Sequence, residues 1–254
     1  MIMVKIKNRM PICMKSKLSF VKHSLRDKFL KQKPENEKFK NMGKNEVAHL
    51  VGGAPSINSL SPDILPKKNV FILNHFWLHD HYPKVDHGFH CISDDFFLLH
   101  PRILEFPKRI NKNCTIVTTD RIKRKLIKLG VSGKIITLNY SASKPVFNKK
   151  YALQDDLTEI VQTGATVAAD FALPMISYMG FSKVVLLGFD LDYGKDVQRY
   201  AYDTNGAIFT NRSYLRNIWP DHARISMQRW IDALVSDGKK VTSLTPTPLN
   251  VEES

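Results

Sequence analysis

Several polar side chains in the C-terminal half are suited to chemistry on a phosphorylated ligand. Tyr200 and Tyr202 can donate hydrogen bonds to a departing phosphate oxygen, and His222 can accept a proton near neutral pH. Asp190 lies just past an apolar run over residues 184–187. The combination of these residues is more informative than any one of them.

Two stretches of small residues favour close approach of a ligand to the backbone. In Gly52-Gly53-Ala54-Pro55-Ser56 the missing side chains leave room for a phosphate or a ribose, and Ser56 is expected to cap the helical turn that follows. The alternative is a tight turn without a ligand. The second stretch, residues 163–169, leads into an apolar helix that runs to Met179, and free N–H groups at a helix start attract an anion.

Three further features lie where predicted strands end. Asn74 can hydrogen-bond a base or a sugar. The histidines at positions 75, 79, 81, 87 and 90 raise the possibility of a metal, but their spacing does not ensure that ligands converge, so we predict no metal site. Asp94, next to Asp95, either holds a divalent cation that bridges nucleotide phosphates, so that magnesium is possible, or caps the next helix.

These residues must be positioned by an alternation of short apolar runs and helical patterns. The predicted strands are Val47–Val51, Val70–Leu73, Phe89–Ile92, Thr115–Thr118, Lys134–Leu138, Lys183–Leu187 and Lys240–Leu244. The predicted helices are Asp120–Leu129, Asp155–Met179 and Trp219–Ser236. This order predicts an α/β fold, a Rossmann-like, mostly parallel sheet with helices on both faces. Such sheets bind ligands beyond the carboxyl ends of their strands.

The net charge of +14 is concentrated near the N-terminus. Residues 1–44 hold thirteen Lys or Arg against three acidic residues, a net of +10, so residues 45–254 carry +4. Nucleic-acid binding is therefore not predicted, because a basic binding face belongs in the folded domain. We divide the chain into a basic arm, 1–44, and a Rossmann-like domain, 45–254. Apolar spacing predicts an amphipathic helix from about Lys15 to Lys33, ended by Pro34, that lies on anionic lipid or packs on the domain.

Composition excludes several classes of protein. The 254 residues are 43% apolar and 24% charged, which argues against disorder, collagen and a disulfide scaffold. Three widely spaced cysteines predict neither disulfides nor a zinc site. No apolar run approaches the roughly 18 residues that cross a bilayer, and no secretory signal is evident. We expect a cytoplasmic protein, either free or at the inner face of the cell membrane, and the sequence is compatible with a homo-oligomer.

Five motifs in order resemble the bacterial sialyltransferases of glycosyltransferase family 42 and the wider MptE-like group, which includes archaeal hydroxymethylpterin diphosphokinases. They are Gly-Gly-Ala-Pro-Ser at 52–56, Asn-His-Phe at 74–76, Met-Gly-Phe at 179–181, Leu-Gly-Phe-Asp at 187–190 and Tyr-Ala-Tyr-Asp-Thr at 200–204. The resemblance covers about residues 46–249. The chain differs from the sialyltransferases at Gly53, where they carry Asn, and around Gln162, where they carry Arg.

The resemblance implies a GT-A-variant-like transferase that moves a sialic-acid-like sugar from a CMP donor to a surface glycan or glycolipid, with inversion and without a required cofactor. In that role Asn74 would contact the donor, and Thr163, Gly164 and Thr166 would lie along the nucleotide. Tyr193 and Tyr200 would hydrogen-bond the leaving phosphate, and His222 would be the general base.

Two other functions stay open at this point. A diphosphokinase acting on a pterin alcohol with ATP and magnesium would depend more on Asp94 and Asp190 than on His222. A protein of polysaccharide assembly that binds a nucleotide without turnover would keep the binding motifs only. The donor sugar, the acceptor and the linkage do not follow from the sequence.

Overall fold

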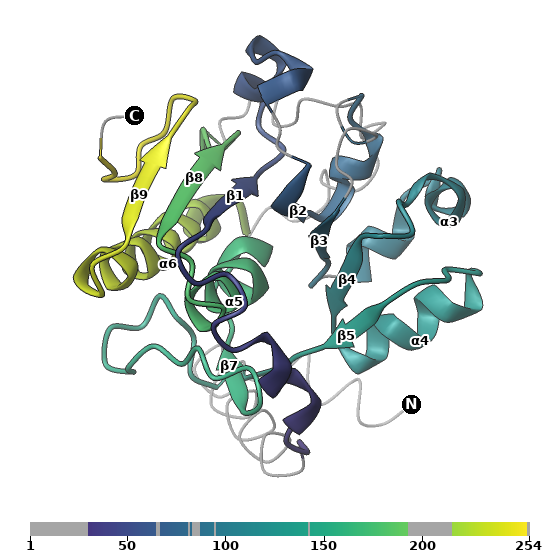
Figure 1. Cartoon of the computed structure of the whole chain (residues 1–254), viewed down its shortest axis with the longest axis horizontal. Coiled ribbons are helices and arrows are strands. Elements are labelled where there is room, and N and C mark those ends of the chain that lie inside the picture. Colours follow the sequence, from purple (N-terminus) through teal and green to yellow (C-terminus); the bar gives the residue numbers. More distant parts are fainter. Residues whose placement is uncertain are drawn as a thin grey trace, which may run out of the picture.

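The computed structural model describes residues 30–64, 67–80, 82, 87–93, 95–141, 143–192 and 215–252. They form a seven-stranded sheet, all parallel, in the order β5-β4-β3-β2-β1-β8-β9 (Figure 1). The strands are β1 Val47–Val51, β2 Lys68–Leu73, β3 His87–Cys91, β4 Thr115–Thr118, β5 Ile135–Thr137, β8 Lys183–Leu187 and β9 Lys240–Ser243. The predicted parallel α/β fold is confirmed.

Both faces of this sheet are buried, because successive residues of a strand point to opposite faces. Leu50 and Leu186 belong to one apolar cluster, which we call the first core. Val51 and Leu187, their neighbours, belong to the second core on the other face. Strands rich in Val, Ile and Leu therefore suit the central positions that they occupy.

Helices cover each face, as predicted. The first core is closed by the π-helical turn η8 (Ala168–Ala172) and the helices α5 (Leu173–Tyr178) and α6 (Leu215–Ser236). The second core is closed by short 3-10 helices and by α3 (Phe106–Arg109) and α4 (Asp120–Lys128). The 3-10 helices that contribute to it are η2 Pro55–Ser59, η4 Asn74–Leu78, η6 Asp95–Leu99 and η7 Ile103–Glu105, whereas η3 Pro62–Ile64 lies between η2 and β2 in the chain.

The long helix predicted over Asp155–Met179 is wrong in its first half. Thr158 donates to the Asp156 carboxylate through both its N–H and its hydroxyl group, which makes a turn. The chain then forms β7 (Ile160–Gln162), which pairs in parallel with β6 (Asn139–Ser141) as a separate small sheet. Regular helix starts only after Ala165, whose φ is +60°. Both strands are three residues long, too short to give an apolar pattern.

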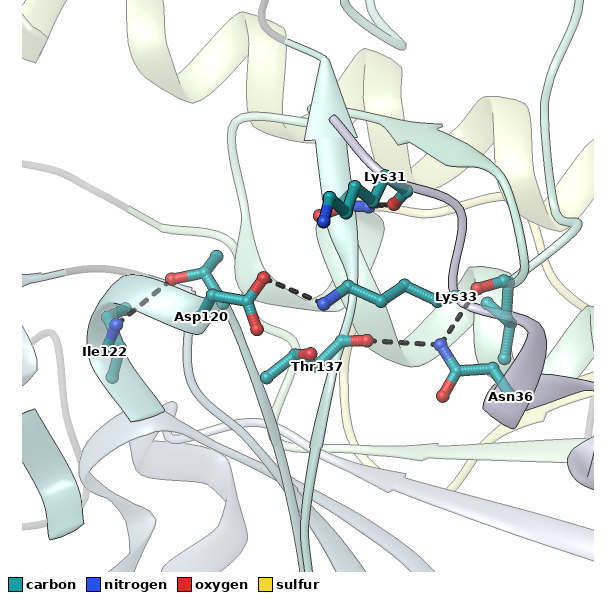
Figure 2. A network of polar contacts seen from close by, with 9 residues as sticks. Lys31, Lys33, Asn36, Asp120, Ile122 and Thr137 are labelled. Atoms are coloured by element: carbon teal, nitrogen blue, oxygen red, sulfur yellow. Dashed lines mark hydrogen bonds and ion pairs between the residues drawn. The ribbon is translucent and has the colours of Figure 1, made fainter. Parts of the chain in front are cut away.

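Residues 30–44 of the basic arm pack against the domain. The predicted amphipathic helix falls almost entirely outside the described residues, and Pro34 begins the 3-10 helix η1 (Pro34–Phe39) rather than ending a helix. The side-chain amide of Asn36 is buried and donates to the carbonyls of Thr137 and Leu157. Lys33 Nζ lies 2.8 Å from the Asp120 carboxylate at the start of α4 (Figure 2).

The described residues include two of the three cysteines and most of the helices. Cys91 and Cys114 are buried free thiols, and burial raises the pKa of the Cys114 thiol to about 12. No helix in the described ranges combines the length and the apolar character that crossing a membrane requires.

Candidate functional site

The topology places the first glycine loop at the switch point of the sheet. Chain order reverses between β1 and β8, and open α/β sheets bind ligands in the crevice at such a point. Val51 is in register with Leu187, so Gly52 and Gly188 leave the sheet side by side. The Gly52 N–H donates to the Leu187 carbonyl and the Ala54 N–H to the Gly188 carbonyl. The two loops therefore form one rigid unit.

The contact between these loops leaves no room for side chains. A Cβ on Gly52 would lie 2.3 Å from the Gly188 carbonyl oxygen, and Gly188 itself has a φ of +70°. Loop 188–190 is also bound by the segment that follows β9: the Gly188 N–H donates to the Thr245 hydroxyl at 2.9 Å, and the Thr247 hydroxyl donates to the Phe189 carbonyl at 2.8 Å. The glycines at both positions are required by this packing.

Asp190 and Ser56 join the two loops through a carboxylate. The Ser56 N–H donates to Asp190 Oδ2 at 3.1 Å, and the Ser56 hydroxyl donates to Oδ1. The expectation that Ser56 caps the following turn is wrong, because Ala54 is the N-cap of η2 and Ser56 lies inside it. The N–H groups of Gly52, Ala54 and Ser56 all donate hydrogen bonds. The Gly53 N–H has no acceptor within the described part of the chain.

Asn74 lies at the same edge, one strand away. Val51 is in register with Ile72, so Asn74 follows β2 level with Gly53. Its φ is +42°, and its buried Oδ1 has no hydrogen-bond partner among the described residues. Its carbonyl lies 2.6 Å from His90 Nε2, which must therefore carry the proton. A strained residue with an unpaired buried acceptor at a strand end is a feature of ligand sites.

The predicted residues Thr163, Gly164 and Thr166 form a second group, and their polar atoms hydrogen-bond to neighbouring residues of the same segment. The Asp170 carboxylate accepts hydrogen bonds from the Gly164 N–H and the Thr163 hydroxyl, and the Thr166 hydroxyl accepts from the Ala169 N–H. Of the amides of residues 163–169 that we expected to face an anion, those of Thr163, Gly164, Thr166 and Ala169 are thus bound to protein oxygens.

His222 lies inside α6 rather than at a helix start. The helix begins at Leu215, four residues before the predicted Trp219, and so includes Pro220. The imidazole is half-buried and stacks on Phe147, with ring centroids 3.9 Å apart and planes 5° apart. Arg229, two turns later on the same helical face, donates to the carbonyls of Val146, Asn148 and Tyr151.

The same segment connects His222 to the second group. The Val146 N–H donates to the Thr163 carbonyl at 2.7 Å, one residue before the ring that stacks on His222. Gly52, Gly53, Ser56, Asn74 and Asp190 thus meet at the switch point, whereas Thr163, Gly164, Thr166 and His222 gather around residues 146–147. Among the described residues, no hydrogen bond or ring contact of the second group reaches the first.

Some predicted residues lie outside the described ranges. Tyr193, Tyr200 and Asp94 are among them. Within those ranges no group of three His, Cys, Asp or Glu side chains could hold a metal ion. His75 and His90 are instead buried, and burial lowers the pKa of each to about 4.

Sequence reasoning did not select Arg229, Thr245 or Asp170. Asp170 and Arg229 lie inside predicted helices, where charged residues are common, and nothing in their spacing identifies the backbone groups that they bind. Thr245 follows the last predicted strand, so the rule that ligands lie beyond strand ends was the one available signal.

We expect Gly52→Ala to lower the free energy of unfolding by about 2 to 3 kcal/mol, because the new methyl group must displace the Gly188 backbone. Urea denaturation measures this change. Gly130→Ala is the matched control: its φ of +84° costs about 1 to 2 kcal/mol, but nothing lies within 4 Å of the added Cβ. A Gly52→Ala protein as stable as the wild type would contradict the close contact between the loops.

No family model and no curated protein matches the sequence. Two solved structures are similar to the chain. One is the monofunctional alpha-2,3-sialyltransferase Cst-I from Campylobacter jejuni, with 14% identity, a TM-score of 0.43, and coverage of 82% of this chain and 81% of that one. The other is a substituted form of the sialyltransferase Cst-II in complex with CMP, with 14% identity, a TM-score of 0.41, and coverage of 80% and 82%.

Proposed function

We propose that the chain is an inverting glycosyltransferase that moves a sialic-acid-like sugar from a CMP-activated donor to a glycan or glycolipid of the cell surface. One observation carries the nucleotide part of this proposal. The loops at 52–56 and 188–190 meet at the switch point, where a parallel sheet holds its ligand, in a contact that only glycine permits. The identity of the nucleotide rests on the five motifs.

The switch-point residues offer the groups that a nucleotide requires. The Gly53 N–H is a donor without a protein partner among the described residues, and a phosphate oxygen is a strong acceptor. The unpaired Asn74 Oδ1, level with it, is an acceptor for a ribose hydroxyl or for the cytosine amino group. Asp190 binds Ser56 and so fixes the loop rather than contacting the phosphate, which it would repel.

In the reaction, the acceptor hydroxyl loses its proton to His222 and attacks the anomeric carbon. The bond from that carbon to the CMP phosphate oxygen breaks, and CMP leaves with the electron pair. Tyr193 and Tyr200 donate hydrogen bonds to that oxygen as its negative charge develops. We propose no cofactor for this step. The surface glycan would be a lipopolysaccharide, a lipooligosaccharide or a capsule.

Ligand binding and product release test this proposal together. We expect CMP to raise the melting temperature more than UDP or ATP with magnesium, because a ligand of the native state stabilises it. Incubation with CMP-sialic acid should release CMP faster when a glycan acceptor is present. Stabilisation by ATP with magnesium but not by CMP would favour the diphosphokinase. Stabilisation by CMP without release would leave a binding protein and refute the transferase.

A further inference from the structure

The folded domain carries a second concentration of positive charge, apart from the arm. Residues 106–134 contain nine Lys or Arg and a single acidic residue, Asp120, a net of +8. Since residues 45–254 carry +4 in all, the rest of that range carries −4. The basic side chains in this segment that are exposed are Lys108, Lys112, Arg121, Arg124, Lys125, Lys128 and Lys134. The charge of the domain is therefore strongly one-sided.

Helix α4 arranges four of these charges in one stripe. Positions 121, 124, 125 and 128 follow the i, i+3, i+4, i+7 spacing of a single helical face, and all four are exposed. Ile122 and Leu126 on the opposite side are buried in the second core and fix the rotation of the helix. The stripe is thus held outward by packing, next to the edge strand β5.

Exposed aliphatic side chains accompany the basic ones. Leu104 in η7 is 72% exposed and Ile127 in α4 is 54% exposed, and both elements cover the second-core face. Figure 1 places α3, which follows η7 directly, and α4 at the same end of the sheet, beyond β4 and β5. Basic side chains that surround exposed aliphatic ones are typical of surfaces that lie on a membrane interface.

The arm is attached at the same place. Lys33 forms its ion pair with Asp120, the first residue of α4, and Asn36 binds the Thr137 carbonyl at the end of β5 (Figure 2). Burial alone would raise the pKa of the Asp120 carboxyl, but hydrogen bonds from Lys33 and Thr137 and the charges of Lys33 and Lys123 outweigh burial and lower it. Residues 1–29 carry a net charge of +7. They join the described chain at Leu30, three residues before Lys33, which contacts the first residue of α4.

We infer that η7, α3 and α4 form a docking surface for a bilayer that contains anionic phospholipid, and that this surface lies beside the attachment of the basic arm. Lipid is favoured over nucleic acid because every exposed large apolar side chain in the described ranges is aliphatic or Met, and none is an aromatic on which bases could stack. The inference concerns a surface away from the switch point and does not depend on the proposed transferase activity.

The test is partition of the full-length protein into vesicles. We expect binding to phosphatidylcholine vesicles that contain phosphatidylglycerol and none to phosphatidylcholine alone. Each basic group near an anionic surface changes partition by about fivefold, so Arg124→Gln with Lys128→Gln should weaken it about 25-fold. The control, Lys149→Gln with Lys240→Gln, removes the same charge beside α6 and on β9, and should leave partition nearly unchanged.

Three outcomes would overturn the inference. Equal partition of the α4 variant and the wild type would leave all binding to the arm. If the α4 variant and the control lost partition equally, binding would depend on the net charge of the protein and not on the α4 surface. Binding of an oligonucleotide without binding of the anionic vesicles would make the surface a nucleic-acid site. Circular dichroism of both variants excludes a failure to fold, and the measurement requires no catalytic turnover.

Discussion

Between pH 7 and pH 4 we expect the free energy of unfolding to fall by about 6 kcal/mol, because two buried histidines are neutral in the folded protein. His75 is 5% exposed and His90 is fully buried. Burial, and to a smaller extent the charge of His100, lowers the pKa of His75 to about 4. Burial lowers the pKa of His90 to about 4, against the hydrogen bond to Asn74.

The sign follows from proton uptake. Between pH 6.5, the usual value for histidine, and pH 4 the unfolded chain binds a proton at each site and the folded chain does not. Acid therefore favours the unfolded state, by about 3 kcal/mol per histidine. The stabilising difference is complete above pH 6.5 and is lost as the pH falls toward 4.

Urea denaturation at a series of pH values measures this dependence. His75→Phe keeps an aromatic ring beside Phe97, whose centroid lies 5.1 Å away, and should remove about half of the slope. A free energy of unfolding that is constant from pH 7 to pH 5 would contradict the assignment of both histidines as buried and neutral. The same substitution at the exposed His87 is the control that tests whether the loss of slope is specific to a buried position.

The sequence pattern was sufficient for the main sheet. The strands at 47–51, 115–118 and 183–187 have the predicted bounds, because each is a short run made mostly of Val, Ile, Leu or Thr. The pattern did not predict β6 and β7. Each of these strands has three residues, and the two strands pair although they lie about 20 residues apart in the chain, which no local pattern encodes. The start of α6 was misplaced because Pro220 reads as a helix beginning.

The sequence also predicted only part of the candidate site. Gly52 and Asp190 were placed at one sheet edge by the rule for parallel strands, and the structure brings both loops to the switch point. The bond from Ser56 to Asp190 joins residues 134 positions apart, and helix capping was the only role that local sequence suggested. The basic stripe on α4 was not recognised because the +8 of residues 106–134 is offset by −4 elsewhere in the domain, so that the sum over residues 45–254 is only +4.

His222 provides the sharpest test of the proposed chemistry, because its ring has two possible roles. As a general base it would accept the proton of the acceptor hydroxyl, and its loss should lower kcat about 1000-fold. As a packing residue it would only stack on Phe147, at 3.9 Å and nearly parallel. His222→Phe separates these roles, since phenylalanine keeps the stacked ring and lacks the nitrogen that accepts a proton.

We expect His222→Ala and His222→Phe to lose turnover equally, with the affinity for CMP unchanged, because a base acts on the acceptor and not on the nucleotide. His222→Phe should also keep the wild-type free energy of unfolding. An active His222→Phe protein would assign the ring to packing, and the base would have to be sought elsewhere. Loss of CMP affinity in both variants would instead place residues 146–147, and the Thr163 loop that they bind, in contact with the nucleotide.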